Sequence, residues 1–426
     1  MLRGPQWQTH ALSVLCLSVV LVSCGGVRVA TTFPVPPNAL TVTSSPESIV
    51  LTTSQRNALG FQYGPPDGTI GVLANGGAYT FFMAGGSTST CTGTPFTGGT
   101  YRLGGSLTSI NASYGCSAAI TPSPDGDPNG YTFDRDYAGG GPVLAVTSAA
   151  GAAGVLHIYH GESQGGACSG LGKCFYSSLG MAISKDRGAT FSKLGEILQP
   201  YVTRSSIINA NANLEVGGGT LLIADGNGQH IPNLAAADPS SVFLYVFYSD
   251  LDPAAATSSP CNQDSCLAVA RAPLAQVVED AFSGNTAAFP TLFKKFYKGR
   301  FTEPGTSGDP NAAANSGHYT PVIATPGSFP SVLYDAAIQQ YLIAYTTGNN
   351  TIEIRHGSAL LSWSSPVASG TITHRPNSIL YPTLIGDGAD PATGNGEPWL
   401  FYVTAPSWPD WSTAALVSRR LQLANK

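Results

Sequence analysis

The chain is poor in charged side chains. Aspartate, glutamate, lysine and arginine make up 11% of its 426 residues, whereas a typical globular protein has about 25%. Glycine (50 residues) and proline (31 residues) are abundant instead. Helical domains need more alanine, leucine, glutamate and lysine, so this composition favours an exported, all-β protein. With a net charge of −5 and no cluster of basic residues, a nucleic-acid partner is not expected.

Several catalytic and cofactor motifs are also missing. No G-x-S-x-G elbow stands on a strand–helix turn, and no fingerprint for a dinucleotide or a nucleotide phosphate is present. The cysteines lack C-x-x-C spacing with a following histidine, so they are not expected to bind metal. The string Asp387-Gly388-Ala389-Asp390 lacks the EF-hand pattern and favours a solvated turn. We therefore expect no cofactor, with a structural or axial calcium ion as the alternative.

The apolar run Ala11–Val22 is too short to span a membrane comfortably. Arg3 precedes this run, and the pair Ser23-Cys24 follows it. The arrangement resembles a bacterial lipoprotein signal, in which the cysteine is lipidated and becomes N-terminal. Lipidation is thus predicted on Cys24, with an ordinary secretory signal as the alternative. The protein is expected to be secreted or lipid-anchored at the bacterial cell envelope, touching membrane only through the anchor. The predicted boundaries are 1–23 for the signal peptide, 24–55 for a flexible tether and 56–426 for the main domain.

The cysteines indicate disulfides. The chain has eight cysteines, of which Cys16 lies in the signal and Cys24 would carry lipid. An even remainder in an exported chain is typical of a disulfide framework. Six cysteines allow 15 pairings, so the connectivity stays open. The simplest expectation pairs neighbours: Cys91 with Cys116, Cys168 with Cys174, and Cys261 with Cys266.

Short alternating strands recur in five groups along the body of the chain. Up-and-down sets repeated in this way are typical of propeller blades. We therefore predict a single five-bladed β-propeller, with a β-sandwich or a pair of β-domains as the alternative. Helical spacing predicts a short surface helix over Leu274–Phe282. The predicted strands are 69–72, 78–83 and 101–107; 143–147, 156–159, 179–183 and the stretch near Phe191; 219–224, 242–248 and 267–270; 331–334, 341–345 and 351–355; and 381–385, 399–403 and 414–421.

A short acidic turn, Ser184 to Phe191, follows one of these strands and reads S-x-D-x-G-x-T-F. Asp186 is expected to accept hydrogen bonds from the backbone N–H groups of the turn. Gly188 is expected to supply a positive φ, and Phe191 to anchor the next strand. The pattern resembles the Asp-box of sialidases and related β-propellers. The resemblance implies a structural turn between the two outer strands of a blade, remote from catalysis.

Other segments resemble the blades of five-bladed propeller glycosidases. They are Phe133–Val143 with Leu156–Glu162, Tyr245–Asp250, Trp363–Pro366 and Tyr381–Gly386. The resemblance covers most of the chain from about residue 60 and is specific for architecture. It matches none of the arabinanases, xylosidases, fructosidases or sialidases in particular. It implies a glycoside hydrolase acting on a poly- or oligosaccharide at the propeller axis.

Hydrolysis of a glycosidic bond needs two carboxyl groups, and four candidates stand next to predicted inner or middle strands. Asp134 and Asp136 precede a glycine run and share one face of an extended segment. Glu162 ends a strand, and by alternation its side chain shares a face with His160, which could tune it. Asp250 ends another strand, where a turn-forming role is the alternative. Asp134 or Asp136 is expected to be the base or nucleophile, and Glu162 or an acid of a later blade the proton donor.

Substrate contacts are expected from polar and aromatic side chains near these acids. The candidates are Arg135, Tyr137, His160, His318 and Tyr381. Tyr159, Tyr319, Trp408 and Trp411 are further aromatic candidates for stacking on a sugar, and Glu303 and Asp309 flank a loop that could close over one. A sialidase proper needs three arginines around a carboxylate, and no motif brings Arg135, Arg204 and Arg355 together.

Three functional hypotheses remain open on these residues. The leading one is a glycoside hydrolase that works as a monomer on a carbohydrate substrate. The alternatives on the same scaffold are a non-catalytic glycan-binding surface lipoprotein and a sialidase-like exo-glycosidase. A weaker alternative is an adhesion propeller that binds protein partners through an apolar patch at one end of its axis.

Overall fold

The computed structural model describes residues 39–64, 66–87, 96–111, 118–123, 133–164, 175–201, 214–251, 261, 265–307, 317–348, 350–374, 377–406 and 413–425. The predicted signal peptide and Cys24, Cys91, Cys116, Cys168 and Cys174 lie outside these residues. Strands dominate the described chain, which confirms the predicted all-β class. Within these ranges, no helix combines the length and the apolar character needed to cross a membrane.

The strands form consecutive antiparallel sets, each named here by its inner strand. The β4 set has β3 Phe61–Tyr63, β4 Gly71–Asn75, β5 Ala78–Ser87, β6 Phe96–Ser106, β7 Ser109–Asn111 and β8 Ala118–Ile120. The β10 set has β9 Tyr137–Gly139, β10 Val143–Thr147, β11 Ala153–Gln164, β12 Phe175–Ser184 and β13 Ser192–Leu198. The β14 set has β14 Leu214–Asp225, β15 Val242–Leu251, β16 Cys266–Pro273, β17 Lys294–Tyr297 and β18 Arg300–Pro304.

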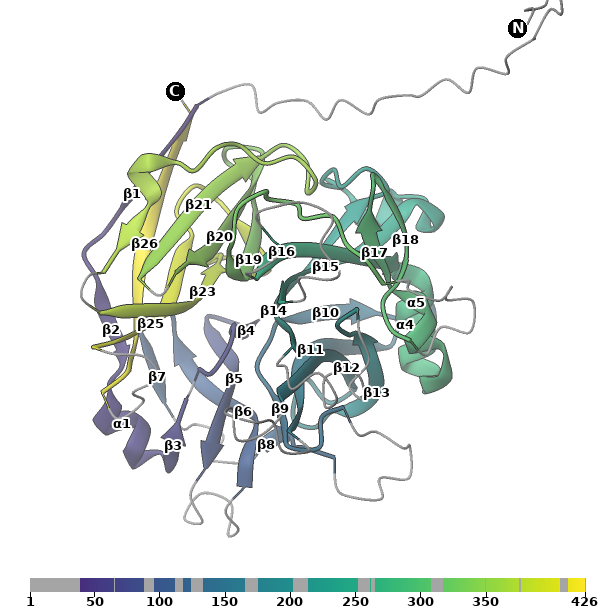
Figure 1. The fold of residues 1–426 in the computed structure, drawn as a ribbon, viewed down its shortest axis with the longest axis horizontal. Helices are drawn as coiled ribbons and strands as arrows, with labels where there is room; N and C mark the ends of the chain where they lie inside the picture. Colours follow the sequence, from purple (N-terminus) through teal and green to yellow (C-terminus); the bar gives the residue numbers. More distant parts are fainter. Residues whose placement is uncertain are drawn as a thin grey trace, which may run out of the picture. The chain divides into compact units, whose positions relative to one another are not determined.

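The remaining strands form two further sets. The β19 set has β19 Ser328–Asp335, β20 Gln340–Thr347, β21 Thr351–Gly357 and β22 Ile372–Thr373, and β24 Thr393–Gly394 pairs with β19 in parallel. The β23 set has β23 Ser378–Ile385, β25 Trp399–Ala405 and β26 Ala415–Asn425, to which β1 Leu40–Ser44 and β2 Ser48–Leu51 are added. Figure 1 shows β4, β10, β14, β19 and β23 around the centre of these strands, with the other strands of each set farther out.

The β23 set joins the two ends of the described chain. β1 pairs with β26 from Leu40 opposite Asn425 to Ser44 opposite Leu421, and β2 pairs with the first part of β26. Residues 40–51 therefore belong to the sheet, whereas the sequence placed them in a flexible tether. The reason is that their apolar side chains, such as Val42, are buried against this sheet. Pairing of the first strands with the last closes the succession of sets on itself.

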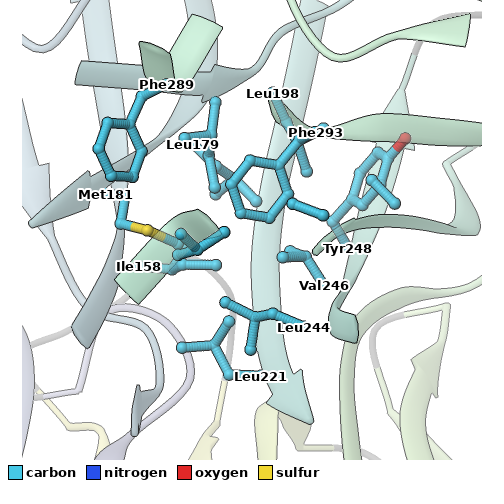
Figure 2. Close-up of a cluster of buried hydrophobic side chains, with 14 of the residues drawn as sticks. Ile158, Leu179, Met181, Leu198, Leu221, Leu244, Val246, Tyr248, Phe289 and Phe293 are labelled. Carbon is cyan, nitrogen blue, oxygen red and sulfur yellow. The ribbon is translucent and has the colours of Figure 1, made fainter. Parts of the chain in front are cut away.

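Alternation along the strands divides the core into layers between neighbouring sets. Figure 2 shows part of the layer between the β10 and β14 sets. In β15, Leu244, Val246 and Tyr248 are buried in the layer shared with the β10 set. The intervening Tyr245 and Phe247 are buried in the layer shared with the β19 set. Because both faces of these sheets are covered, their strands are apolar on both faces, which accounts for the few charged residues.

Short helices cover parts of the strand framework. The predicted surface helix forms as α4 Leu274–Ser283, whose Val277, Val278 and Ala281 are buried against the β14 set. It ends at Gly284, whose φ of 74° caps the helix. Among the described residues, the other helices are α1 Thr53–Ala58, α5 Phe289–Leu292 and the 3₁₀ turns η1 Leu234–Ala236, η2 Pro239–Ser241, η3 Thr286–Ala288 and η4 Ala368–Gly370.

The acidic turn between β12 and β13 has the predicted geometry. Asp186 accepts hydrogen bonds from the backbone N–H and the hydroxyl of Thr190, at 2.9 and 2.6 Å. Gly188 has a φ of 82° and donates its N–H to the Ser184 hydroxyl at 2.7 Å. Slight burial acts to raise the pKa of Asp186, but the hydrogen bonds from Thr190 and Ser184 lower it to about 2. The turn is thus held by an ionised carboxylate.

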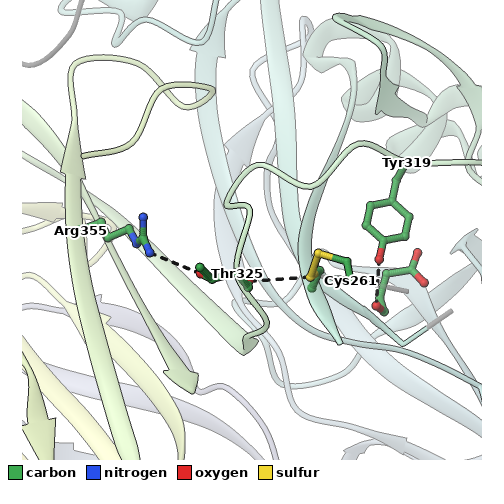
Figure 3. The surroundings of a disulfide bond; sticks show 6 residues. Cys261, Tyr319, Thr325 and Arg355 are labelled. Atoms are coloured by element: carbon green, nitrogen blue, oxygen red, sulfur yellow. Dashed lines mark hydrogen bonds between the residues drawn. A yellow bond between two sulfur atoms is a disulfide. The ribbon is translucent and has the colours of Figure 1, made fainter. Parts of the chain in front are cut away.

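One of the expected disulfides lies in the described chain. Cys261 and Cys266 are bonded (Figure 3), which closes a short loop at the start of β16. Beside this loop, the hydroxyl of Tyr319 donates to the backbone carbonyl of Asp250 at 3.2 Å. The Cys266 sulfur contacts the Thr325 carbonyl, so the disulfide lies between β15 and the segment that leads to β19.

The inner strands are linked by hydroxyl groups, which we call the hydroxyl belt: Thr69, Thr220, Ser331 and Thr383. The Thr69 hydroxyl donates to the Gly219 carbonyl at 3.1 Å, joining the start of β4 to β14. The Thr220 hydroxyl donates to the Pro330 carbonyl at 3.0 Å and accepts from the Val332 N–H at 3.1 Å, joining β14 to β19.

The other two hydroxyls complete the circuit. Ser331 accepts from the Leu384 N–H at 2.8 Å, and Thr383 accepts from the Ile70 N–H at 3.1 Å. These bonds join β19 to β23 and β23 back to the start of β4. The Gly141 N–H donates to the Thr69 carbonyl at 2.9 Å and attaches the segment before β10. The belt thus supplies hydrogen-bond partners for backbone N–H and carbonyl groups of the inner strands, which have no neighbouring strand on the side that faces the centre.

Replacing Thr220 by valine tests the hydroxyl belt. T220V keeps the side-chain shape but leaves the Pro330 carbonyl and the Val332 N–H unpaired and buried. We expect a loss of about 2–3 kcal/mol in the free energy of unfolding, measured by urea denaturation, because an orphaned buried polar group costs about 1–3 kcal/mol. T43V on the exposed face of β1 is the control and is expected to change stability by less than about 0.5 kcal/mol. Equal stabilities of the two variants would contradict the role of the belt.

Candidate functional site

A cavity of about 260 Å³ lies at the N-terminal ends of the inner strands, next to the hydroxyl belt. Every strand set contributes to its walls. Three carboxylates face it from different sets: Asp67 from the loop before β4, Glu162 from β11 and Glu215 from β14. The other side chains that line it are Thr69, Tyr137, Ile158, His160, Phe175, Leu179, Phe329 and Tyr381.

Asp67 is held by two tyrosines from other sets. The Tyr381 hydroxyl donates to one carboxylate oxygen at 3.0 Å, and the Tyr137 hydroxyl donates to the other at 3.2 Å. Burial, followed by the charge of Glu162, raises the pKa of Asp67 to about 6, although the two hydroxyls and His160 act to lower it. Burial and the charge of Asp67 raise the pKa of both tyrosines well above the ordinary value, so they remain donors. Asp67 is therefore a positioned carboxylate that titrates near neutrality.

Glu162 is paired with a histidine two residues before it. His160 Nε2 lies 3.2 Å from Glu162 Oε1, as the alternation of β11 predicts. Burial favours the neutral imidazole, but the hydrogen bond and charge of Glu162, with smaller effects from Glu215 and Asp67, raise the pKa of His160. The three carboxylates around His160 therefore favour its protonated imidazolium form over the effect of burial.

Glu215 lies beside His160 because Gly217 leaves room for both. A Cβ atom on Gly217 would lie 2.6 Å from Glu215 Oε1 and 3.1 Å from His160 Nδ1. Burial raises the pKa of Glu215, and the charges of Glu162 and Asp67 add to this effect while His160 opposes it. The surroundings of Glu215, like those of Asp67, therefore favour the protonated form.

Glycines also make room for the tyrosine rings around Asp67. A Cβ on Gly98 in β6 would lie 2.3 Å from the Tyr137 ring and 2.6 Å from the Tyr63 hydroxyl. A Cβ on Gly86 in β5 would overlap the Tyr63 ring. The glycine-rich ends of β5 and β6 are thus required by the aromatic side chains that they hold.

Two aromatic residues form the opposite wall of the cavity. Phe329 and Tyr381 have φ values of 56° and 58°, and their rings meet edge to face with centroids 4.6 Å apart. A side chain in this left-handed region costs about 1–3 kcal/mol and is retained where the surroundings enforce it. Each residue precedes a proline and lies at a bulge of its strand, at the level of the hydroxyl belt. The backbone therefore bends so that these two rings face the cavity.

The cavity has an acidic character. None of the described side chains that line it belongs to lysine or arginine. His160 is the group there whose surroundings favour a positive charge. Among the described residues, no three His, Cys, Asp or Glu side chains are placed to hold a metal ion together. The arrangement suits a neutral, hydroxyl-rich ligand flanked by carboxyl groups.

The structure brings together several of the residues predicted from sequence. Glu162, His160, Tyr137 and Tyr381 all line the cavity. His318 is placed elsewhere, because its ring stacks between Tyr201 and Tyr297 at the β17–β18 side of the β14 set, with centroid distances of 4.3 and 5.4 Å.

The other predicted carboxylates do not line the cavity. Asp134 is fully buried, pairs with Lys193 and accepts from the Tyr159 hydroxyl at 3.0 Å. Asp250 is fully buried, and its carboxylate lies 3.6 Å from the Lys295 ammonium group. Both acids therefore balance a lysine inside the strand framework.

Asp136 and Arg135 lie on the turn before β9 and contact each other, with 3.6 Å between the guanidinium and the carboxylate. The backbone N–H of Asp136 donates to the Glu162 carbonyl at 3.0 Å, so this turn supports Glu162 through its main chain. Arg204, Asp309, Trp408 and Trp411 lie outside the described residues.

Sequence reasoning missed Asp67 and Glu215. Asp67 stands in Pro66-Asp67-Gly68, and Glu215 stands just before Gly217-Gly218-Gly219. Both are acids followed by glycine at the entry to an inner strand. The same pattern, an acid shortly before a glycine run, drew attention to Asp134 and Asp136. A search for this pattern before every predicted inner strand would have found Asp67 and Glu215.

Replacing Glu215 by glutamine tests the electrostatic state of the cavity. A raised carboxyl pKa means that the native state favours the proton, so stability is greatest below the unfolded value and falls as pH rises through the native value. We expect E215Q to be more stable than the native sequence at pH 8 and to show no such gain at pH 4. A thermal melt measures this as a rise of about 2–4 °C per kcal/mol gained. E279Q, on the exposed face of α4, is the control, and a pH-independent difference for E215Q would contradict the assignment.

Comparisons with known proteins show that the three-dimensional structure of this chain is similar to solved structures. No protein-family model matches the chain, and no curated protein matches it. Similar solved structures include the catalytic domain of a GH62 α-L-arabinofuranosidase from Coprinopsis cinerea, with 12% identity, a TM-score of 0.44, and 90% of this chain and 97% of that chain covered. A GH62 hydrolase in complex with xylotriose has 10% identity and a TM-score of 0.45, covering 90% of this chain and 97% of that one. An exo-β-1,3-galactanase from Clostridium thermocellum has 10% identity and a TM-score of 0.42, covering 88% and 61%.

Proposed function

We propose that the protein is a glycoside hydrolase of five-bladed β-propeller architecture that acts on a poly- or oligosaccharide. The strand sets named for β4, β10, β14, β19 and β23 would be the five blades. The observation that carries the proposal is the meeting of Asp67, Glu162 and Glu215, from three sets, in one cavity. Glycosidic hydrolysis needs a protonated and an ionised carboxyl group on either side of the bond. Burial raises the pKa of both Asp67 and Glu215, and the two tyrosine hydroxyls that donate to Asp67 act to lower its pKa.

Each carboxyl group receives a role from its environment. Glu215 is the proposed proton donor to the leaving oxygen, because burial favours its protonated form. Asp67 is the proposed base or nucleophile, since two hydroxyls fix its oxygens and it is ionised above pH about 6. Glu162 Oε1 lies 3.2 Å from His160 Nε2, and the charge of Glu162 raises the pKa of both Glu215 and Asp67. Phe329 and Tyr381 offer ring faces or edges on which a sugar can pack.

The acidic lining bears on the alternative functions. A sialidase-like enzyme needs arginines to clamp the carboxylate of its substrate, and the described lining has none. Arg355, one of the sequence candidates, instead donates to the Tyr345 hydroxyl at 2.7 Å within the β19 set. A non-catalytic glycan-binding protein would bind sugar in this cavity without releasing reducing ends, and the first experiment below separates the two.

The remaining sequence expectations are part of the same proposal. We propose an exported protein with a signal peptide over 1–23 and a lipid on Cys24, or secretion after ordinary cleavage. Cys91 with Cys116 and Cys168 with Cys174 are the proposed further disulfides. The enzyme is proposed to work as a monomer without a cofactor and with carbohydrate as its partner.

The proposed roles of Glu215 as acid and Asp67 as base or nucleophile can be distinguished with substrates that differ in their leaving group. After a screen of plant, bacterial and algal glycans identifies a substrate, E215Q is expected to lower kcat/KM on it by about 10²–10⁴-fold. The same variant should lose little on an aryl glycoside with a good leaving group, which departs without a proton. D67N should lose activity on both substrates, because attack on the sugar is impaired. D136N is the comparison and should stay near the native rate.

Two results would overturn these roles. Full activity of both D67N and E215Q in folded protein would exclude the cavity as the catalytic site. Saturable binding of a glycan by the native protein, with no reducing sugar released from any member of the panel, would favour the binding-protein alternative.

Tyr381 offers a test by pH. The Tyr381 hydroxyl lowers the pKa of Asp67 against the larger effect of burial. Y381F removes this hydrogen bond, so the pKa of Asp67 should rise and the acidic limb of kcat/KM, expected near pH 6 in the native enzyme, should move to higher pH. The profile of kcat/KM against pH measures the shift. F329L, which alters the same wall without touching Asp67, should leave the limb in place, and an unmoved limb in Y381F would exclude Asp67 as the ionising group.

A further inference from the structure

A fully buried histidine, His157, lies on β11 at the junction of the β4 and β10 sets. Ile158 and His160 of the same strand line the acidic cavity, so by alternation His157 lies on the face of β11 that points away from it. Its ring packs among aromatic rings from three elements. They are Phe82 of β5, Tyr159 of β11 and Phe191 of the Asp186 turn, with centroid distances of 6.0, 6.5 and 5.3 Å.

Both ring nitrogens of His157 have polar partners. Nδ1 lies 3.0 Å from the Pro142 carbonyl oxygen, and because a carbonyl only accepts, Nδ1 carries the proton. Nε2 of the neutral ring then accepts from the Thr100 hydroxyl at 3.4 Å. Burial lowers the pKa of His157 to about 4, although the bond to Pro142 opposes this effect. The ring therefore stays neutral, in one tautomer, over the pH range in which Asp67 titrates.

Pro142 ends the segment that leads from β9 to β10, residues 137–142, which we call the β9 segment. His157 holds the end of this segment through the Pro142 carbonyl. The Thr100 hydroxyl, the other partner of His157, also lies 3.5 Å from the Ala138 carbonyl oxygen of the same segment. His157 thus contacts the β9 segment directly at its end and through Thr100 near its start.

The other side of the β9 segment holds Asp67. At the start of the segment, the Tyr137 hydroxyl donates to the Asp67 carboxylate at 3.2 Å and lies 3.1 Å from the Asp67 carbonyl oxygen. Near the end of the segment, the Gly141 N–H donates to the Thr69 carbonyl at 2.9 Å. Residues 67–69 are therefore attached at both ends of the β9 segment, and a displacement of the segment would move the Tyr137 hydroxyl relative to Asp67.

We propose that His157 is a positioning residue for Asp67, which acts through the β9 segment and does not touch the substrate. The inference rests on the proposed function, in which Asp67 is the base or nucleophile. The Tyr137 hydroxyl acts to lower the pKa of Asp67, so a β9 segment released at Pro142 should leave Asp67 with a weaker hydrogen bond and a higher pKa. The other groups that act on Asp67, or feel its charge, are Glu162, His160, Tyr381, Glu215 and Tyr63, and the substitutions below leave all of them in place.

Titration of Asp67 in the full chain tests the proposal, by carbon-13 NMR of labelled aspartate carboxyl groups with D67N to assign the signal. H157N and H157L have side chains of nearly the same shape, but only asparagine can donate to Pro142 from the position of Nδ1. H157F keeps a ring in the aromatic cluster and cannot donate. The pKa of Asp67 should stay at about 6 in H157N and should rise by about 0.5–1 pH unit in H157L and H157F.

F191L is the control, because it loosens the same aromatic cluster without removing the bond to Pro142, and it should leave the pKa of Asp67 unchanged. An unchanged pKa of Asp67 in H157L and H157F would overturn the inference. Equal shifts in H157N and H157L would assign the effect to packing and would overturn it as well. Nitrogen-15 NMR of the native protein should show His157 with its proton on Nδ1, and a proton on Nε2 would overturn the inference without the use of any variant that fails to fold.

Activity measurements separate this inference from the proposed function. If the native protein hydrolyses a glycan, the acidic limb of kcat/KM should move with the pKa of Asp67, so that kcat/KM at pH 5 is about three- to tenfold lower in H157L than in H157N. If the native protein releases no sugar, the proposed function fails, whereas the NMR titration still decides whether His157 positions Asp67.

Discussion

The arrangement of the chain depends on how the inner strands are joined at the centre, where no β-ladder connects them. The hydroxyl belt of Thr69, Thr220, Ser331 and Thr383 joins the inner strands β4, β14, β19 and β23, and the backbone N–H of Gly141 attaches the segment before β10. Each hydroxyl replaces a missing strand partner for a buried backbone group, which would otherwise be costly. The acidic cavity lies beside the belt, at the N-terminal ends of the inner strands. The fold and this cavity therefore depend on the same few bonds.

The acidic cavity brings together carboxyl groups whose charged form is disfavoured by burial. Three carboxylates share a space with one histidine, and burial raises the pKa of two of them. Elsewhere in the core, Asp134 and Asp250 each lie against a lysine, whereas Glu196 is a further buried acid, whose pKa burial raises to about 7. The cavity differs from these positions because its acids meet tyrosine hydroxyls and a histidine, and none of its described lining side chains belongs to lysine or arginine.

The sequence predicted correctly the structural features that depend on residues close together in the chain. The alternating strands, helix α4 and the Asp186 turn depend on local periodicity and turn chemistry, and the structure contains all three. Glu162 and His160 were predicted to share a face because two residues on one strand must do so. The error with Asp134 and Asp250 has a different origin, since their lysine partners, Lys193 and Lys295, come from other strands. Asp67 and Glu215 meet only when distant strands converge, and local pattern alone cannot show this.

The cavity has two chemically distinct halves, and the backbone explains the division. At the level of the belt the inner strands bend through a positive φ, which glycine provides in the acidic sets, at Gly68, Gly141 and Gly218. In the β19 and β23 sets the same bend occurs at Phe329 and Tyr381, each followed by proline and then a hydroxyl of the belt. Glycine at the bend leaves space for an acid from a nearby position, whereas an aromatic residue fills it with a ring. One repeated backbone feature thus yields a charged half and an aromatic half of the cavity, and the sugar that we propose as its ligand would meet carboxyl groups on one side and a ring wall on the other.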